Sequence, residues 1–534
     1  MMKKKSRISR ILMVSLAAIL MLTMSFGCSK QDAGSAKTEK LTTDVVVVGA
    51  GASGISAAVA AADQGAKVII IEKTAMLGGA SNLSWAGKFI NSSTALKNGV
   101  KVDEEKIIND WIVLNHWRVN AAQLRQYITT SGDTYDWLAN HGYPTTFLNF
   151  FGEQMHMLPD YAIRQDLFKK MLANSVEKNG GQVLTETTGK SLLTNDKGEV
   201  VGVSSTKKDG TTLEITAKAV IIATGGYAGN DAMVKEASGF DNIQGGLSQN
   251  IGEGLEMAWA VGAEKPVNFG IQMFHQTLTP GTATLKTQYS NDKASYPLML
   301  TYLPTFMNVS QSGDRFRDET SVYTPDAAAN TSIYQGPVHY VIVSQSQIDA
   351  MTKEGMQGVK VDRLPAMPPE FYLDWADKFK LDNPWVDLQK VLDSLVENKN
   401  GFKGATLDEL ATNAGFDAAT LKATFASYDN ASKTGVDADF GKAAKYLVAY
   451  GEGPYYAIPA QINNLASCGG LNVNKSFQVL STKKIPIKGL YAVGLEAEGV
   501  LFSDAYVGNG DGIGYAFTSG RLGGDYAAKD VLGK

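Results

Sequence analysis

The sequence predicts an α/β protein with a Rossmann-like nucleotide-binding domain, discontinuous in the chain, and an inserted α+β domain. Three observations support this prediction. A continuous apolar run at 45–48 predicts a buried parallel strand, and a G-x-G-x-x-G pattern at 49–54 follows it directly. A second apolar run at 68–71 ends at the acidic residue Glu72. Near the other end of the chain, 502–521 holds five glycines and leads into a helical pattern, which indicates backbone that approaches a ligand closely.

Composition limits the classes of function. A chain of 534 residues is long enough for two or three domains. It is 44% hydrophobic and 19% charged, with a net charge of -4 and no basic block beyond the N-terminal segment, so nucleic acid is not an expected partner. Two cysteines, Cys28 and Cys468, rule out a disulfide framework, and the absence of Cys-x-x-Cys-His rules out covalently attached haem. No metal site is predicted.

The N-terminus predicts export. Lysines and arginines in 3–10 form a positive region, 11–26 is apolar, and Gly27-Cys28 precedes a polar segment. Residues 1–28 resemble a bacterial lipoprotein signal, although Ser25 departs from the usual aliphatic residue. The resemblance implies lipidation of Cys28, a polar linker at 29–41, and a location on the extracytoplasmic face of the cell membrane. An uncleaved anchor helix is the alternative, and it also places the protein outside the cytoplasm.

The first strand–helix–strand unit predicts a dinucleotide site. The glycines permit a tight turn and a close approach of backbone to a pyrophosphate at the helix N-terminus. Glu72 lies 23 residues after Gly49, where it can accept hydrogen bonds from a ribose hydroxyl. The alternative is a turn of the same fold that binds no ligand. The residues expected to bind the cofactor here are Gly49, Gly51, Ser53, Gly54, Glu72 and Lys73.

Further segments resemble FAD-dependent enzymes of the fumarate reductase and 3-ketosteroid dehydrogenase superfamily. They are "LGGASNLSWAG" at 77–87, "AKAVIIATGGYAGN" at 217–230 and "GLYAVGLEAEGV" at 489–500. The third segment argues against NAD, because nicotinamide enzymes normally lack it, although its acidic residue is shifted by one position from the family's Gly-Glu. The resemblance implies non-covalent FAD and adds these cofactor contacts: Gly78, Gly79, Ala80, Ser81, Thr224, Gly225, Gly494, Glu496, Gly512 and Ile513.

The resemblance also implies the domain boundaries. The FAD-binding domain is expected at 42–268 and again at 466–534. Between its two parts, 269–465 is expected to form a mobile α+β cap that closes on substrate and excludes water. Within this region the resemblance is loosest between about 330 and 445.

The cations that a fumarate reductase needs are mostly missing. The segment "SGDRFRDETSVY" at 312–323 matches the family's catalytic region, but Tyr323 stands where the proton-donating arginine is expected. Tyr506 stands near the position of a second arginine, and only His275 has a plausible counterpart among the family's substrate-binding histidines. Burying two carboxylates without positive partners is costly, so a dicarboxylate substrate is disfavoured.

Both tyrosines fit the 3-ketosteroid dehydrogenase pattern. Those enzymes carry Arg-Phe-x-Asn-Glu-Ser-x-x-Tyr, with the spacing of Arg315 to Tyr323, and Tyr-x-Gly-x-Gly-x-x-Ile-Gly, which matches 506–514 without a gap. The resemblance implies that Tyr506 and the Gly510 N–H hold a carbonyl oxygen while Tyr323 moves a proton. Such neutral donors stabilise an enolate as an oxyanion hole does. The alternative for each tyrosine is a packing role with a satisfied hydroxyl.

The expected function is reduction of a carbon–carbon double bond conjugated to a carbonyl, as in an enone, unsaturated lactone or aryl acrylate. NADH is not accessible outside the cytoplasm. A separate membrane-linked protein, such as one carrying FMN or haem, is therefore the expected electron donor. Two alternatives remain at this point: the reverse reaction of a ketosteroid-type dehydrogenase, and a non-catalytic FAD electron-transfer lipoprotein.

Overall fold

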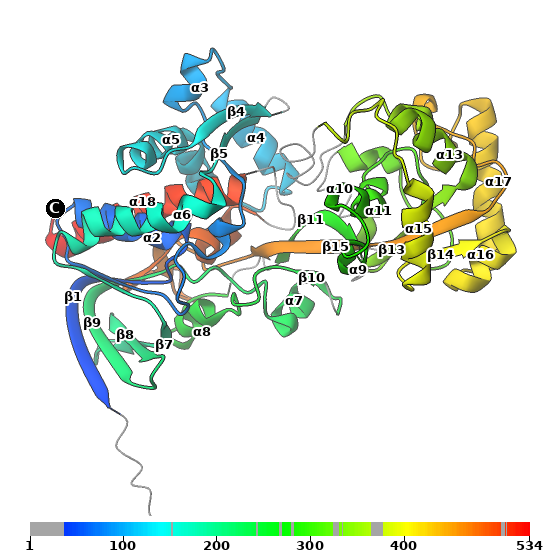
Figure 1. Cartoon of the computed structure of the whole chain (residues 1–534). Coiled ribbons are helices and arrows are strands. Elements are labelled where there is room, and N and C mark those ends of the chain that lie inside the picture. Colours follow the sequence, from blue (N-terminus) through cyan, green and yellow to red (C-terminus); the bar gives the residue numbers. More distant parts are fainter. Residues whose placement is uncertain are drawn as a thin grey trace, which may run out of the picture.

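The computed structural model forms two lobes that a long strand connects (Figure 1). It describes residues 37–534 except 151–152, 242–243, 266–269, 279–281, 324–330, 334, 365–376, 503–507 and 509. One lobe contains the N-terminal strands and the C-terminal helix, and the other contains most of the middle of the chain. No helix in the described part of the chain has both the length and the apolarity to cross a membrane.

An eight-stranded sheet forms the centre of the first lobe, with a path ordered β16-β17-β9-β1-β2-β6; β8 pairs with β9, and β7 pairs with β8. β1 runs parallel to β2 and to β9, and Val45–Val48 are buried on both faces. Its strands are β1 (Thr38–Val48), β2 (Val68–Ile71), β6 (Gln182–Leu184), β7 (Thr187–Thr194), β8 (Val200–Lys207), β9 (Thr212–Ile222), β16 (Gln478–Leu480) and β17 (Pro486–Ala492).

The start of β1 corrects one expected boundary. The linker was expected to extend to residue 41, but the strand begins at Thr38, which lies opposite Thr212 of β9. Four further residues thus join the sheet, because backbone hydrogen bonds to β9 offset the low apolarity of this segment. The discontinuous domain is also visible in this sheet, since Leu490 of β17 lies opposite Val220 of β9.

Helices α2 (Ala52–Asp63) and α18 (Asp511–Leu532) pack against each other beside the sheet (Figure 1). Their contact is close because α18 carries glycines where it crosses α2. A Cβ on Gly520 would lie 2.3 Å from the Ser53 carbonyl oxygen, and one on Gly524 would lie 2.2 Å from that of Ala57. The two parts of the domain, distant in sequence, therefore share one core.

Further elements cover this lobe. A three-stranded sheet is ordered β3-β5-β4, and α5 contacts α18. These elements are β3 (Ala86–Lys88), β4 (Thr146–Phe150), β5 (Glu153–Met157), α3 (Ser93–Lys97), α4 (Glu104–Leu114), α5 (Ala121–Asn140), α6 (Tyr161–Leu172), α7 (Asp231–Ser238), α8 (Glu253–Ala260), η1 (Gly79–Asn82), η2 (Ala173–Glu177) and η6 (Gly494–Val500).

The second lobe, which we call the cap, is built on a six-stranded sheet around β15, the strand that reaches from one lobe to the other (Figure 1). Its strands are β10 (Gln244–Gly245), β11 (Gly270–Leu278), β12 (Asn308–Val309), β13 (Val338–Ser344), β14 (Phe402–Gly404) and β15 (Tyr455–Cys468). Its helices are α9 (Thr282–Leu285), α10 (Asn291–Ala294), α11 (Tyr296–Leu300), η3 (Glu319–Tyr323), α13 (Gln345–Glu354), η4 (Gly355–Val359), α15 (Leu388–Glu397), α16 (Leu407–Ala414), α17 (Ala418–Thr434) and η5 (Ala444–Tyr446). The buried side chains of the cap form apolar clusters separate from that of the first lobe.

Candidate active site

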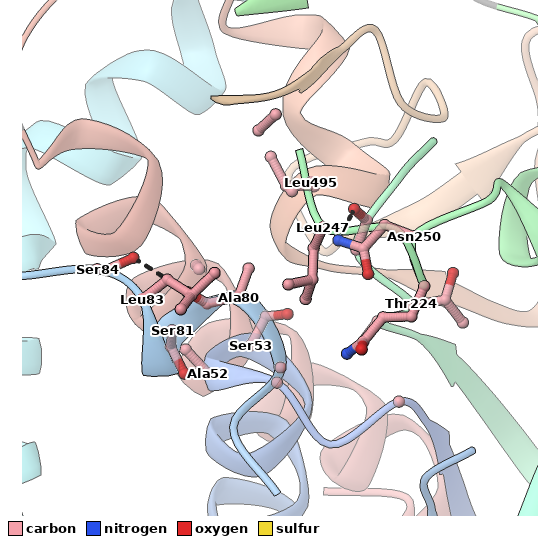
Figure 2. A pocket seen from close by; sticks show the side chains of 18 of the residues that line it. Ala52, Ser53, Ala80, Ser81, Leu83, Ser84, Thr224, Leu247, Asn250 and Leu495 are labelled. Carbon is pink, nitrogen blue, oxygen red and sulfur yellow. Dashed lines mark hydrogen bonds between the residues drawn. The ribbon is translucent and has the colours of Figure 1, made fainter. Parts of the chain in front are cut away.

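A cavity of about 440 Å³ lies where β1, β2 and β9 end, and both parts of the discontinuous domain line it. Figure 2 shows Ala80, Leu83 and Ser84 on one side of this cavity and Thr224, Leu247 and Asn250 on the other. Open α/β sheets bind ligands at the carboxyl ends of their strands. The predicted residues that line the cavity are Gly49, Gly51, Ser53, Glu72, Lys73, Gly79, Ala80, Ser81, Thr224, Gly225, Gly510, Gly512 and Ile513.

The N-terminus of α2 is built for an anion. Its N-cap residue, Gly51, makes no side-chain cap hydrogen bond, so the N–H groups of the first turn stay directed at the cavity. A Cβ on Gly51 would clash with no protein atom, since its nearest neighbour would be the Gly78 carbonyl oxygen at 3.9 Å, and it would occupy space at the cavity. Gly54 does not line the cavity. It lets the helix approach the strand, because a Cβ there would lie 1.9 Å from the Gly49 carbonyl oxygen.

Glu72 is buried at the end of β2 and ties together the loops that surround it. Its carboxylate accepts hydrogen bonds from the N–H of Ala50 at 2.9 Å and from the N–H and hydroxyl of Thr74, each at 2.9 Å. Next to it, the Lys73 ammonium pairs with the Glu253 carboxylate at 2.8 Å, and both residues line the cavity. One end of the cavity is therefore polar and charged, as a ribose and a base require.

The segment 79–81 forms the opposite wall, and Gly78, a predicted contact, precedes it without lining the cavity. Gly78 adopts a φ of 97°, which favours glycine, and its N–H donates to the Ala50 carbonyl at 2.7 Å. From behind the wall, the buried Arg164 guanidinium donates to the carbonyls of Ser81 and Ser84, each at 2.6 Å. Arg164 therefore fixes the shape of this segment without lining the cavity itself.

Glu496, which the resemblance placed among the cofactor contacts, does not line the cavity. Its carboxylate is fully buried behind the cavity wall, where it accepts hydrogen bonds from the Thr224 hydroxyl and, at 3.0 Å, from the Gly226 N–H. Leu495 faces the cavity in its place. Burial raises the pKa of Glu496, and the hydrogen bonds from Thr224 and Gly226 only partly offset this rise. Glu496 supports the turn that contains Thr224, and the one-position shift seen in the sequence explains the change.

Gly494 also acts through packing. Its N–H donates to the Ser519 hydroxyl at 2.9 Å, and a Cβ there would lie 2.4 Å from the Ser53 hydroxyl oxygen. At the other glycine-rich turn, α18 begins after Gly510, which has a φ of 79° and makes no side-chain cap hydrogen bond. Gly510, Gly512 and Ile513 line the cavity, so a second helix N-terminus points its positive end at the ligand.

A protein-family model described as an FAD binding domain matches residues 44–513. The chain belongs to this family. The mixed α/β architecture with its parallel sheet is the one that the sequence predicted, so the predicted fold class is confirmed.

Two relatives extend over almost the whole chain. Vinyl phenol reductase of Lactiplantibacillus plantarum is 29% identical over 500 residues, which cover 91% of this chain and 96% of that protein. Fumarate reductase (cytochrome) of Shewanella frigidimarina is 28% identical and covers 94% of this chain and 80% of that protein. Among solved structures, 3-ketosteroid delta1-dehydrogenase from Sterolibacterium denitrificans superposes with a TM-score of 0.66 at 19% identity, covering 92% of this chain and all of that one.

FAD is therefore the cofactor, and the chain is an FAD-dependent oxidoreductase that acts on carbon–carbon bonds, as its relatives do. The cavity fits this cofactor on its own features. The N-terminus of α2 suits a pyrophosphate, that of α18 suits the electron-rich edge of a reduced flavin, and Glu72 with Lys73 suits the ribose end. When bound, reduced FAD supplies a hydride, that is, two electrons and one proton.

Not every predicted substrate contact can be placed. Cys28 and Tyr506 lie outside the described residues, and so does the side chain of His275. The backbone of His275 lies in β11 opposite Asn463 of β15, at the root of the cap. Their predicted roles therefore remain predictions.

Tyr323 is described, and it lies in the cap at the end of η3. It is half-buried and is not among the described residues that line the cofactor cavity. Its hydroxyl donates to the Arg363 carbonyl at 3.2 Å, and its ring lies 5.8 Å from that of Tyr446. Burial, and after it a hydrogen bond with the Tyr446 hydroxyl, raises the pKa of Tyr323 above its ordinary value of 10.0.

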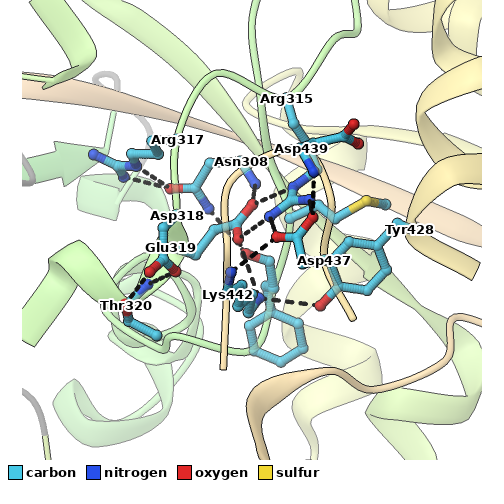
Figure 3. A network of polar contacts seen from close by, with 12 residues as sticks. Asn308, Arg315, Arg317, Asp318, Glu319, Thr320, Tyr428, Asp437, Asp439 and Lys442 are labelled. Carbon is cyan, nitrogen blue, oxygen red and sulfur yellow. Dashed lines mark hydrogen bonds and ion pairs between the residues drawn. The ribbon is translucent and has the colours of Figure 1, made fainter. Parts of the chain in front are cut away.

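A buried ionic cluster holds η3 in place (Figure 3). It consists of Arg315, Glu319, Asp437 and Lys442. Arg315 donates to Glu319 at 2.8 Å and to Asp437 at 3.0 Å, and the Lys442 ammonium lies 3.1 Å from Glu319. The two cations and two anions balance, so each buried charge has a partner of opposite sign. Because Glu319 and Tyr323 are the two ends of η3, this cluster fixes the base from which Tyr323 projects.

Proposed function

We propose that the protein reduces a carbon–carbon double bond conjugated to a carbonyl group. In this proposal Tyr323 donates the proton, while Tyr506 and the Gly510 N–H hold the carbonyl oxygen. The reaction adds one hydride and one proton to the double bond and leaves FAD oxidised. Because Tyr323 belongs to the cap and Gly510 to the cofactor cavity, closure of the cap is required to complete the site.

The hydrogen bond from the Tyr323 hydroxyl to the Arg363 carbonyl is the observation that supports this direction of reaction, because it holds the hydroxyl in its protonated form, and burial raises the pKa of Tyr323 in the same sense. A tyrosine whose pKa lies above 10.0 keeps its proton at neutral pH. Such a group is a poor base for removing a proton from a saturated ketone. It is well matched to give a proton to a carbanion or enolate that forms when hydride arrives. These properties favour reduction over the dehydrogenase direction, and the two matched tyrosine motifs favour an enzyme over a carrier without a substrate.

A vinyl phenol is a second candidate substrate. The observation in its favour is the alignment of vinyl phenol reductase with 91% of this chain. In such a molecule the phenol oxygen would take the place of the carbonyl oxygen between Tyr506 and Gly510. Both candidates carry one uncharged oxygen atom conjugated with the double bond, and two neutral donors suit such an oxygen better than they suit a pair of carboxylates.

The setting of the reaction belongs to the same proposal. The positive and apolar N-terminal segments before Cys28 support lipid anchoring at the extracytoplasmic face of the cell membrane. The electrons would then come from a separate membrane-linked protein, such as one carrying FMN or haem. Labelling cells with a fatty-acid analogue tests the anchor, and a Cys28→Ala variant that still incorporates the label would contradict it.

The catalytic assignment is tested with Tyr323→Phe. The variant is expected to bind FAD stoichiometrically but to reoxidise its photoreduced flavin at least about 100-fold more slowly with the best of a panel of enones, aryl acrylates and vinyl phenols. Tyr455→Phe is the matched control, since the Tyr455 hydroxyl donates to the Gly451 carbonyl elsewhere in the cap. Undiminished reoxidation by Tyr323→Phe would end the assignment, and rapid reduction of fumarate would overturn the argument from missing cations.

A further inference from the structure

Three short segments of the cap meet around Tyr323. The loop between η4 and the segment 365–376 contributes Asp362 and Arg363, and η5 contributes Lys445 and Tyr446. The Tyr446 hydroxyl donates to the Asp362 carboxylate at 2.8 Å, and the Lys445 ammonium pairs with the same carboxylate at 2.7 Å. No motif in the sequence links these residues.

The contacts place these polar groups beside one another between Tyr323 and the surface. Tyr323 is half-buried and Tyr446 is 4% exposed, whereas the side chain of Asp362 is 47% exposed. The two tyrosine rings lie 5.8 Å apart between their centres, and the neighbouring Tyr446 hydroxyl contributes to the raised pKa of Tyr323. A hydroxyl can donate one hydrogen bond and accept another at the same time, so Tyr446 can pass a proton along this path. The path leads from the proposed acid to solvent.

We propose that Tyr446 and Asp362 return the proton to Tyr323 in each catalytic cycle. This inference rests on the proposed function, in which Tyr323 loses its proton to carbon. The Tyr323 O–H bond breaks as the new C–H bond forms, and a tyrosinate remains. The Tyr446 O–H bond then breaks as the Tyr323 O–H bond re-forms, and water held by Asp362 restores the proton on Tyr446. No electrons move in these steps, and one proton is taken from solvent for each double bond reduced.

The relay has a chemical reason in this chain. With the cap closed over the substrate, water is excluded from the reacting side of Tyr323. A tyrosinate that is not reprotonated cannot serve the next turnover, so a second route to solvent is needed. Asp362 suits this role as a fixed acceptor rather than as an acid, because hydrogen bonds from Lys445 and Tyr446 lower its pKa. Tyr446 and Asp362 act through Tyr323 and are positioning residues that do not touch substrate.

The test separates the first turnover from later ones. Photoreduced holoenzyme is mixed with the best substrate of the panel in a stopped-flow instrument, and steady-state turnover is measured with reduced methyl viologen as electron donor. Tyr446→Phe is expected to complete its first turnover within about twofold of the wild-type rate, because Tyr323 begins protonated. Its kcat is expected to fall about 10- to 100-fold, with a larger solvent deuterium isotope effect than that of the wild type.

Asp362→Asn provides a second variant at an exposed position and is expected to show the same pattern to a smaller degree. Tyr455→Phe should leave both rates unchanged. If Tyr446→Phe turns over at the wild-type rate, or loses the first turnover and the steady state equally, the relay is overturned. If Tyr323→Phe keeps both rates, the proposed function falls instead, so the two failures are distinguishable.

Discussion

The Arg363 guanidinium lies 3.9 Å from the centre of the Tyr323 ring, while the backbone carbonyl of the same residue accepts the Tyr323 hydroxyl. Arg363 therefore touches the proposed acid in two ways, one through charge and one through its main chain. The charged contact stabilises a tyrosinate, whereas the backbone contact holds the protonated hydroxyl. Substitution of the side chain separates the two, because the carbonyl stays in place.

Arg363→Met is expected to lower kcat without unfolding the cap. The tyrosinate left after proton donation loses a nearby cation worth about 1 to 2 kcal/mol, which corresponds to a roughly 5- to 30-fold fall in kcat. Steady-state assays with reduced methyl viologen measure this change, and Arg363→Lys should recover part of the rate because it restores a positive charge. Equal kcat values for Arg363→Met and the wild type would show that the guanidinium does not act on Tyr323.

Gly51 and Gly54, two glycines of the pattern between β1 and α2, should respond differently to the same added methyl group. Gly51→Ala places its Cβ in open space at the cavity, so the apoprotein should keep its stability while its FAD content falls. Gly54→Ala forces a Cβ to within 1.9 Å of a backbone oxygen, and it should lower the free energy of unfolding by about 1 to 3 kcal/mol. Flavin absorbance per protein and thermal unfolding of the apoprotein distinguish the two. If Gly51→Ala binds FAD normally, Gly51 is not needed for the approach of the cofactor. If Gly54→Ala is as stable as the wild type, Gly54 is not needed for packing.

Glu496 predicts a particular dependence of stability on pH. Burial raises its pKa in the folded protein above the ordinary value of 4.5, so between these two values the folded state holds a proton that the unfolded state has lost. The contribution of the group is fully present below pH 4.5 and is lost as pH rises through the raised pKa. The side chain of a Glu496→Gln variant does not titrate, so the variant does not lose this contribution to stability as pH rises. Its Tm relative to the wild type should therefore increase between pH 5 and pH 8, and parallel Tm curves would contradict the prediction.

The sequence predicted the parts of the site that depend on local order. The strand, glycine turn, helix and strand up to Glu72 occur as predicted, because each requirement is met within about thirty neighbouring residues. Glu496 shows the limit of this reasoning. It is only one position from the expected place, yet that step moves its carboxylate behind Thr224 and brings Leu495 to the cavity.

The surroundings of Tyr323 could not be predicted in the same way. Arg363 and Tyr446 follow it by 40 and 123 positions, and neither lies in a pattern that a spacing rule describes. They meet Tyr323 because the cap folds them together, and Arg363 lies in the part of the cap, about 330–445, where the resemblance is loosest. The motif indicated the proposed acid, whereas only the three-dimensional structure shows the groups that set its pKa and that we propose to resupply its proton.

The buried cluster below η3 should make the cap sensitive to acid. Burial alone would raise the pKa of Glu319, but attraction by Lys442 and Arg315 outweighs it and lowers that pKa below 4.5. The pKa of Asp437 shifts in the same direction. Burial would raise it, but the hydrogen bond and charge of Arg315 outweigh burial and lower it below the ordinary value of 3.8. Lowered pKa values contribute stability above the ordinary values, and this stability is lost as pH falls through the folded-state values.

Asp437→Asn is expected to lower the free energy of unfolding by about 3 to 5 kcal/mol at pH 7, since it leaves the buried Arg315 partly uncompensated. Its stability should also fall less steeply than that of the wild type as pH drops below 4, because one titrating carboxylate is gone. Asp439→Asn is the matched control, two positions away and exposed, with its carboxylate bonded to the Ser427 hydroxyl. Circular dichroism melts between pH 3 and pH 7 measure both effects. A loss of stability shared equally by the two variants would mean that the cluster does not hold η3, and Tyr323 would then need another support.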